Sequence, residues 1–140
     1  MNFLLKITVP FIFIIFVSFS AQEKNKKEVF KISYKAETRG SFIIIHFKDS
    51  SLVLKSTSAD KSVVLSNAEV INIYNIVSKI KLSEIGALIA PSNERYRDAA
   101  LTGSFIILKN DTSYTSSNFD HGNPPKELQE LYNILQKYLK

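Results

Sequence analysis

The segment FKISYKAE, residues 30–37, alternates strictly between apolar and polar side chains. Phe30, Ile32, Tyr34 and Ala36 share one side, and the lysines, serine and glutamate between them share the other. Alternation with a period of two is typical of a β-strand that buries one face. The segment therefore predicts a sheet that is covered on one side.

More strands are expected after the break at Thr38-Arg39-Gly40. The run SFIIIHFK, residues 41–48, is apolar on both faces, which indicates a central strand. A turn at Asp49-Ser50-Ser51 leads into a third strand, LVLKS at 52–56, and a short strand is expected through 63–65.

Two amphipathic helices are expected. Ser66 and Glu69 have the spacing of a capping box, so the first helix should begin there and run over about 67–81. After the loop DHGNPP, a second helix extends toward the C-terminus. Apolar residues recur at helical spacing in both: Val70, Ile73, Tyr74, Val77 and Ile80 in the first, and Leu128, Leu131, Leu135 and Tyr138 in the second. The stretch between 81 and 101 is the least regular and is expected to hold a short strand around Leu88 and Ile89.

The two halves of the chain share sequence. GSFII occurs at 40–44 and again at 103–107, and EVINIYNIVSK at 69–79 matches ELQELYNILQK at 127–137 without a gap. We therefore predict an α+β fold in which a ββα unit is duplicated, at about 40–81 and 103–140, after an extra N-terminal strand. A mainly antiparallel sheet would carry both helices on one face.

The N-terminus has the pattern of an export signal. One lysine precedes an apolar run from Ile7 to Phe19, and Ser18, Ser20 and Ala21 supply the small residues near a cleavage site. A spanning helix needs about 20 apolar residues, and this run is shorter and interrupted by Pro10. We predict a signal peptide at 1–21, cleaved at 20–21, then a charged leader at 22–28 and a single domain at 29–140. The mature protein would be periplasmic or extracellular, without stable membrane insertion.

Composition excludes several classes of protein. The chain has 140 residues, no cysteine and two histidines. Disulfide frameworks and zinc-thiolate sites are therefore excluded, and neither a metal site nor a cofactor is expected. The net charge of +5 is not clustered as in a nucleic-acid footprint, so no nucleic acid is expected as a partner.

Polar residues that could take part in catalysis or binding are expected at one end of the second hairpin. If Asn110-Asp111 forms its turn, Lys109 pairs with Thr112, and the same ladder places Leu101 opposite Asp120. Continuing it sets Ala100 against His121 and Asp98 against Asn123.

This register predicts a small polar site. Asp98, Asp120 and His121 are the candidate catalytic residues, with His121 as proton acceptor. Arg95 and Arg97 are candidate ligands for a carboxylate or phosphate, and Arg39 could reach this end or its counterpart in the other unit. The alternative is structural: Asp98 pairs with an arginine, Asp120 caps a turn, and Gly122 supplies an unusual backbone angle.

Two functions remain open. One is a non-enzymatic binding module that holds a protein or an envelope ligand on its uncovered sheet face or at the loop end. The other is a small hydrolase or ligand-processing enzyme that uses Asp98, Asp120 and His121. The small size of the mature chain favours the binding module, because so few residues can hardly line an enclosed substrate pocket.

The segment FDHGNPPKELQELYNIL resembles the C-terminal part of small exported bacterial proteins of unknown function. The shared features are a hairpin strand, the loop D-H-G-x-P-P and an amphipathic helix. The resemblance covers residues 104–140 best and implies no activity.

Overall fold

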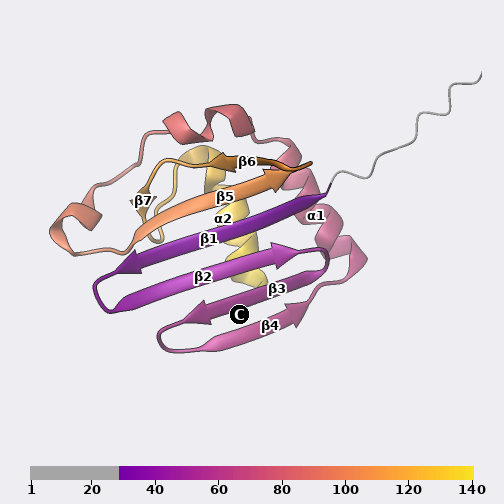
Figure 1. The fold of residues 1–140 in the computed structure, drawn as a ribbon, viewed down its shortest axis with the longest axis horizontal. Coiled ribbons are helices and arrows are strands. Elements are labelled where there is room, and N and C mark those ends of the chain that lie inside the picture. The colour runs from indigo at the N-terminus through magenta and orange to yellow at the C-terminus, as the bar shows by residue number, and fades with distance from the viewer. Residues whose placement is uncertain (1–28) are drawn as a thin grey trace, which may run out of the picture.

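A seven-stranded antiparallel sheet forms the body of the computed structural model, which describes residues 29–140 (Figure 1). Six strands follow the order β4-β3-β2-β1-β5-β6, and β7 pairs with β5 beyond the end of β6. The strands are β1 (Phe30–Thr38), β2 (Ser41–Lys48), β3 (Ser51–Ser56), β4 (Asp60–Val64), β5 (Thr102–Lys109), β6 (Thr112–Thr115) and β7 (Phe119–Asp120). The predicted signal peptide and charged leader lie outside the described residues.

The alternation in β1 is confirmed. Phe30, Ile32, Tyr34 and Ala36 are at most 2% exposed, while the residues between them face the other side of the sheet. β1 pairs with β2 on one side and β5 on the other, so it lies in the middle of the sheet. The predicted central place of β2 is also confirmed, because β2 lies between β1 and β3.

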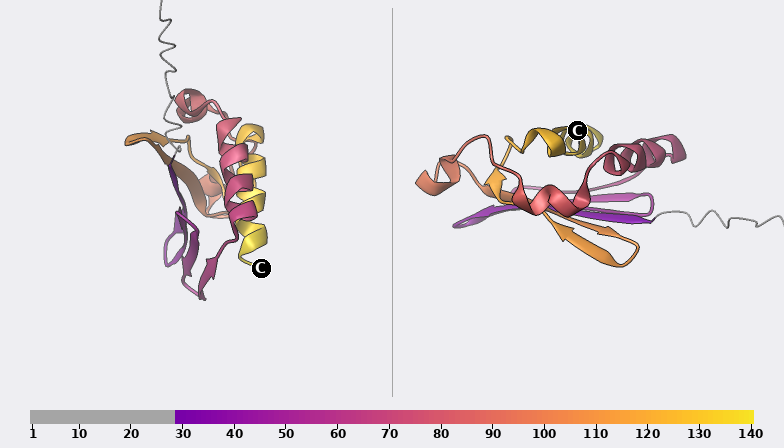
Figure 2. Two further views of the ribbon diagram at one scale, coloured as in Figure 1. Left: turned by 90° about the vertical axis from the view of Figure 1, so that its right-hand side faces the viewer. Right: turned by 90° about the horizontal axis from the view of Figure 1, so that it is seen from above.

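Both long helices, α1 (Asn67–Ser78) and α2 (Lys126–Tyr138), pack on one face of the sheet, and the opposite face is open (Figure 2). The α+β class with an antiparallel sheet is therefore as predicted. The core forms between these layers. It includes Phe47, Phe105, Ile107 and Phe119 from the sheet and Ile73, Val77, Leu128, Leu131 and Leu135 from the helices.

The capping box that begins α1 is present: Glu69 N–H donates to Ser66 Oγ, and the Glu69 carboxylate accepts from Ser66 N–H at 2.8 Å. The helix ends at Ser78 rather than near Lys81. Directly after the helix, the Ile80 N–H donates to the carbonyl of Val77, three residues earlier, which is the spacing of a 3-10 turn. α2 follows the predicted loop DHGNPP directly, with Pro125 as the residue before its first turn.

The predicted strand around Leu88 and Ile89 is wrong. The chain forms a 3-10 helix, η1 (Leu82–Ala87), and Ile89 is 89% exposed. η1 buries Ile85 and lies beside β6, and Ser117 N–H, in the link between β6 and β7, donates to the Ile85 carbonyl. The Leu88 carbonyl accepts a hydrogen bond from the Ser117 side chain rather than from a neighbouring strand.

The second hairpin follows the predicted register from its turn along the whole of β6, as far as the pair Ile106–Thr115. Asn110 and Asp111 both have positive φ, at 47° and 68°, and Lys109 pairs with Thr112. Between β6 and β7 the chain carries one extra residue, so Asp120 pairs with Thr102 and not with Leu101. The partners expected for His121 and Asp98 are wrong for the same reason: His121 N–H donates to Leu101, and Asn123 pairs with Asp120.

The two GSFII segments have different places in the fold. Gly40 lies in the β1–β2 turn with φ of 82°, while Gly103 lies inside β5. Phe42 is 41% exposed on the open face and Phe105 is fully buried on the covered face. The matched residues therefore point to opposite sides of the sheet, and the duplication stays a prediction from sequence.

Candidate functional site

The Asp120 carboxylate holds the short 3-10 helix η2 (Glu94–Arg97) against the end of the sheet. Oδ2 accepts from Ser92 Oγ at 2.5 Å and from Glu94 N–H at 2.8 Å. Oδ1 accepts from the backbone amide and from Nη1 of Arg95, each at 3.0 Å. A carboxylate has about four lone-pair directions, so these four donors saturate Asp120.

The Arg95 side chain is part of the same contact. It is 7% exposed and Asp120 is 3% exposed, so their ion pair is buried. Nη1 also donates to the Ser92 carbonyl at 2.6 Å, and the guanidinium lies over the Tyr96 ring at 4.4 Å. Asn123 donates to Ser92 Oγ at 2.8 Å and ties in the loop that follows β7. We call Ser92, Glu94, Arg95 and Asp120 the Asp120 clasp.

Burial would raise the pKa of the Asp120 carboxyl, but the donors from Ser92, Arg95 and Glu94 outweigh it and hold this pKa well below its usual range. A carboxylate this acidic is a poor proton acceptor near neutral pH. The geometry therefore favours the structural alternative for Asp120, which caps the turn at Glu94 and Arg95. The arginine pair that this alternative assigned to Asp98 is formed by Asp120 instead.

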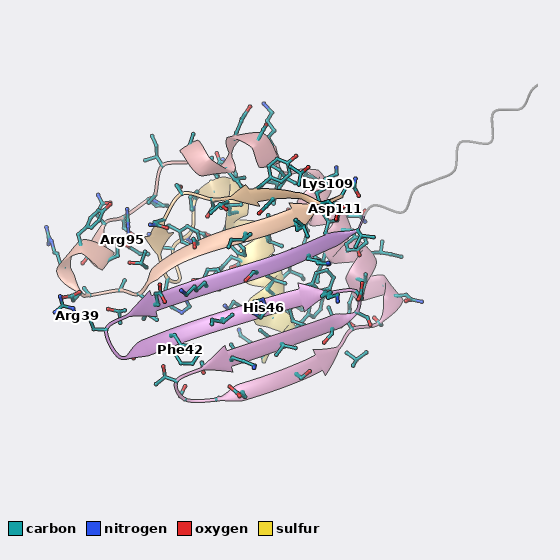
Figure 3. All side chains as sticks on the ribbon, viewed as in Figure 1. Arg39, Phe42, His46, Arg95, Lys109 and Asp111 are labelled. Carbon is teal, nitrogen blue, oxygen red and sulfur yellow. The ribbon has the colours of Figure 1, made fainter. Side chains whose placement is uncertain are left out.

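The other candidates in this loop do not converge on Asp120. Arg97 and Asp98 are exposed, and Asp98 ends η2 in the left-handed conformation with φ of 54°. Arg39 lies in the β1–β2 turn at the same end of the sheet, and its side chain is exposed (Figure 3). The structure thus brings Arg95 to Asp120 and leaves Arg39, Arg97 and Asp98 on the surface.

His121 follows directly after β7 and contacts a different set of residues from Asp120. Its Nδ1 lies 2.7 Å from the hydroxyl of Tyr34, and its ring packs against Tyr34 and Tyr132. Burial raises the pKa of Tyr34 far above its usual value, and burial lowers the pKa of His121. A neutral His121 that accepts from the Tyr34 hydroxyl is the arrangement these shifts favour.

Gly103 makes room for that contact. A Cβ on Gly103 would lie 2.9 Å from the Tyr34 hydroxyl and 3.1 Å from the Phe119 ring. From the sequence, Gly103 was noted only as part of the GSFII repeat. Its close approach to Tyr34 could not be predicted, because β1 and β5 are far apart in the chain.

Most of the open face of the sheet was not predicted from the sequence. Its basic side chains are Lys31 and Lys35 from β1, Lys48 from β2 and Lys55 from β3. His46 of β2 lies on the same face, opposite Ser33 and Val53 (Figure 3). Its acidic side chains are Glu37, which pairs with Lys35 at 2.7 Å, and Asp60 at the edge strand. Basic groups therefore outnumber acidic groups along strands β1 to β4.

Apolar side chains lie between these charges. Phe42 and Ile106 are 41% and 44% exposed, and Val64 at the edge is 79% exposed. Ile44, Val53 and Leu108 are half-buried on the same face. The sequence does contain a signal for apolar side chains on the open face. SFIIIHFK and SFIILK carry apolar residues at both odd and even positions, so each strand must place some of them on each face of the sheet.

Within residues 29–140, no three histidine, aspartate or glutamate side chains are placed to hold a metal ion. No helix in that range is long and apolar enough to span a membrane. Comparison with family models, curated proteins and solved structures finds no match to this chain. The resemblance of residues 104–140 to small exported bacterial proteins stays a prediction.

Proposed function

We propose that this protein is an exported, non-enzymatic binding module that holds an acidic partner protein on its open sheet face. The observation that carries the proposal is the composition of that face, where exposed apolar side chains lie among four lysines and two carboxylates. Exposed apolar side chains on a sheet face where one charge prevails are typical of an interaction site.

Charge complementarity supports an acidic partner. Glu37 is already engaged by Lys35, so the remaining lysines have a single carboxylate, Asp60, among the strand residues of this face. Acidic groups on a partner would supply the missing counter-charges, and its apolar groups would cover Phe42 and Ile106.

The hydrolase alternative has less support. It needs a base near neutral pH, and Asp120 is saturated by four donors inside the clasp. His121 is turned to Tyr34, and Asp98 is an exposed end of η2.

Export rests on the sequence of residues 1–21, with cleavage at 20–21 and a periplasmic or extracellular location. Mass spectrometry of the protein released from expressing cells should find a chain that begins at residue 21 or 22. Recovery of the uncleaved chain in membranes would contradict export and cleavage.

A photo-crosslinking side chain at position 106 tests the binding function in the exporting cell. The matched control is position 71 on α1, where the isoleucine is 58% exposed on the helical layer. We expect discrete adducts with an acidic protein from position 106 and none from position 71.

Charge-reversal variants complete the test. Lys48→Glu on the open face should abolish the adduct, and Lys79→Glu at the end of α1 should leave it unchanged. Equal adducts from positions 106 and 71, or an adduct that survives Lys48→Glu, would contradict the proposal.

A further inference from the structure

A shallow hollow of about 320 Å³ opens on the open face, where β2, β1 and β5 lie side by side. Its polar lining comes from Lys31 and Ser33 on β1 and from His46 and Lys48 on β2. Ile106 and Leu108 of β5 form an apolar wall beside the two lysines.

The two lysines of the hollow face each other directly. Lys31 and Lys48 are partners in the β1–β2 ladder, which is closed by Thr38 and Ser41 around a two-residue turn. Counting outward from that closing pair places Lys31 and Lys48 at a non-hydrogen-bonded position, where side chains come closest. Like charges at such positions destabilise the sheet.

Nothing in the described part of the chain forms an ion pair with either lysine. The ion pairs within residues 29–140 join Lys35 to Glu37, Lys81 to Glu84 and Arg95 to Asp120. Asp60, the remaining strand carboxylate of this face, lies three strands away from Lys31, opposite Lys55. An anion between Lys31 and Lys48 would relieve their repulsion.

We infer that this hollow binds a glutamate or aspartate carboxylate of the partner protein, with an adjacent apolar side chain of the partner against Ile106 and Leu108. The inference rests on the proposed function and names the group that the open face recognises. The Ser33 hydroxyl and the His46 ring are further polar groups within the hollow. The apolar wall favours a carboxylate on a short aliphatic stem over a strongly hydrated inorganic anion.

Peptide titration followed by NMR of the isotope-labelled protein tests the inference. The probe is a capped peptide Ser-Leu-Glu-Leu-Ser, and its matched control has glutamine in place of glutamate. We expect the glutamate peptide to shift the amide signals of Lys31, Ser33 and Lys48 and to bind about tenfold tighter than the glutamine peptide.

Two lysine variants provide the internal control. Lys31→Gln should remove the preference for the glutamate peptide, while Lys55→Gln, on the same face outside the hollow, should keep it. The unliganded Lys31→Gln protein should melt at the same temperature or up to about 2 °C higher, because a like-charge contact is lost.

Three results would overturn the inference. They are equal binding of the two peptides, a melting temperature of Lys31→Gln that falls, and tighter binding of decanoate than of the glutamate peptide. The last would assign the hollow to a free amphiphile. If the peptides bind alike while the adduct at position 106 still depends on Lys48, this inference fails and the proposed function stands.

Discussion

The Asp120 clasp and the open sheet face use charged side chains in opposite ways. In the clasp, one carboxylate receives four hydrogen bonds and the charges of Asp120 and Arg95 cancel inside the protein. On the open face, Lys31 and Lys48 lie opposite each other without an ion pair in the described part of the chain, beside the exposed Ile106. A polar group that is fully satisfied internally stabilises the fold, whereas unsatisfied charges beside apolar surface are available to a partner.

The largest effect should come from breaking the clasp. Asp120→Asn removes the counter-charge of the buried Arg95 and should lower the free energy of unfolding by about 3–5 kcal/mol. Asp98→Asn, in the exposed part of the same loop, should change it by less than about 0.5 kcal/mol. Urea unfolding of both variants checks this, and a stable Asp120→Asn protein would contradict the structural role of the clasp.

Alanine substitution of two neighbouring isoleucines of β5 compares the covered face of the sheet with the open face. Ile107 is fully buried, so Ile107→Ala should cost about 2–5 kcal/mol of unfolding free energy. Ile106 is 44% exposed, so Ile106→Ala should cost less than about 1 kcal/mol. The account predicts that only Ile106→Ala weakens binding of the glutamate peptide in the folded protein. Equal costs of unfolding would mean that the open face is covered in solution.

Gly103→Ala tests the contact between Tyr34 and the glycine. The new methyl group would meet the Tyr34 hydroxyl and the Phe119 ring, so we expect a loss of about 1–3 kcal/mol in unfolding free energy. Ser104→Ala on the next position is the control and should be close to neutral. A neutral Gly103→Ala would show that the strands can move apart at this point.

The smallest effect concerns pH. Because the pKa of His121 is lowered in the folded protein, the unfolded chain binds its proton first, and stability falls as the pH drops below about 6.5. The melting temperature should therefore fall by about 2 °C between pH 7.5 and pH 5.5 through this group. His121→Gln should remove that part of the pH dependence, and His46→Gln should leave it. An unchanged dependence in His121→Gln would contradict the Tyr34–His121 contact.

The sequence predicted most of the sheet because its signals are local. The period-two pattern of 30–37 and the Asn110-Asp111 turn each depend on a few adjacent residues, and the structure confirms both. The capping box at Ser66 and Glu69 is confirmed for the same reason. The wrong strand near Leu88 shows the limit of such signals, since η1 is fixed by packing against a distant hairpin strand.

The candidate site was predicted only in part. Proximity of Arg95 to Asp120 followed from the hairpin ladder, but the extra residue between β6 and β7 shifted every pairing beyond it. That shift has no signature in TSYTSSNF, because serines and threonines suit both faces of a strand. The pairing of Lys31 with Lys48 required the full β1–β2 register, which a single strand cannot supply.

The most direct test of the account is the location of the peptide site by amide chemical-shift mapping with the glutamate peptide. The account predicts that the shifted signals gather on β1, β2 and β5, around Lys31, Lys48 and Ile106. Signals of the Asp120 clasp, from Ser92, Glu94, Arg95 and Asp120, should not move. Shifts that gather at the clasp and at His121 would contradict the assignment and would move the binding site to that end of the sheet.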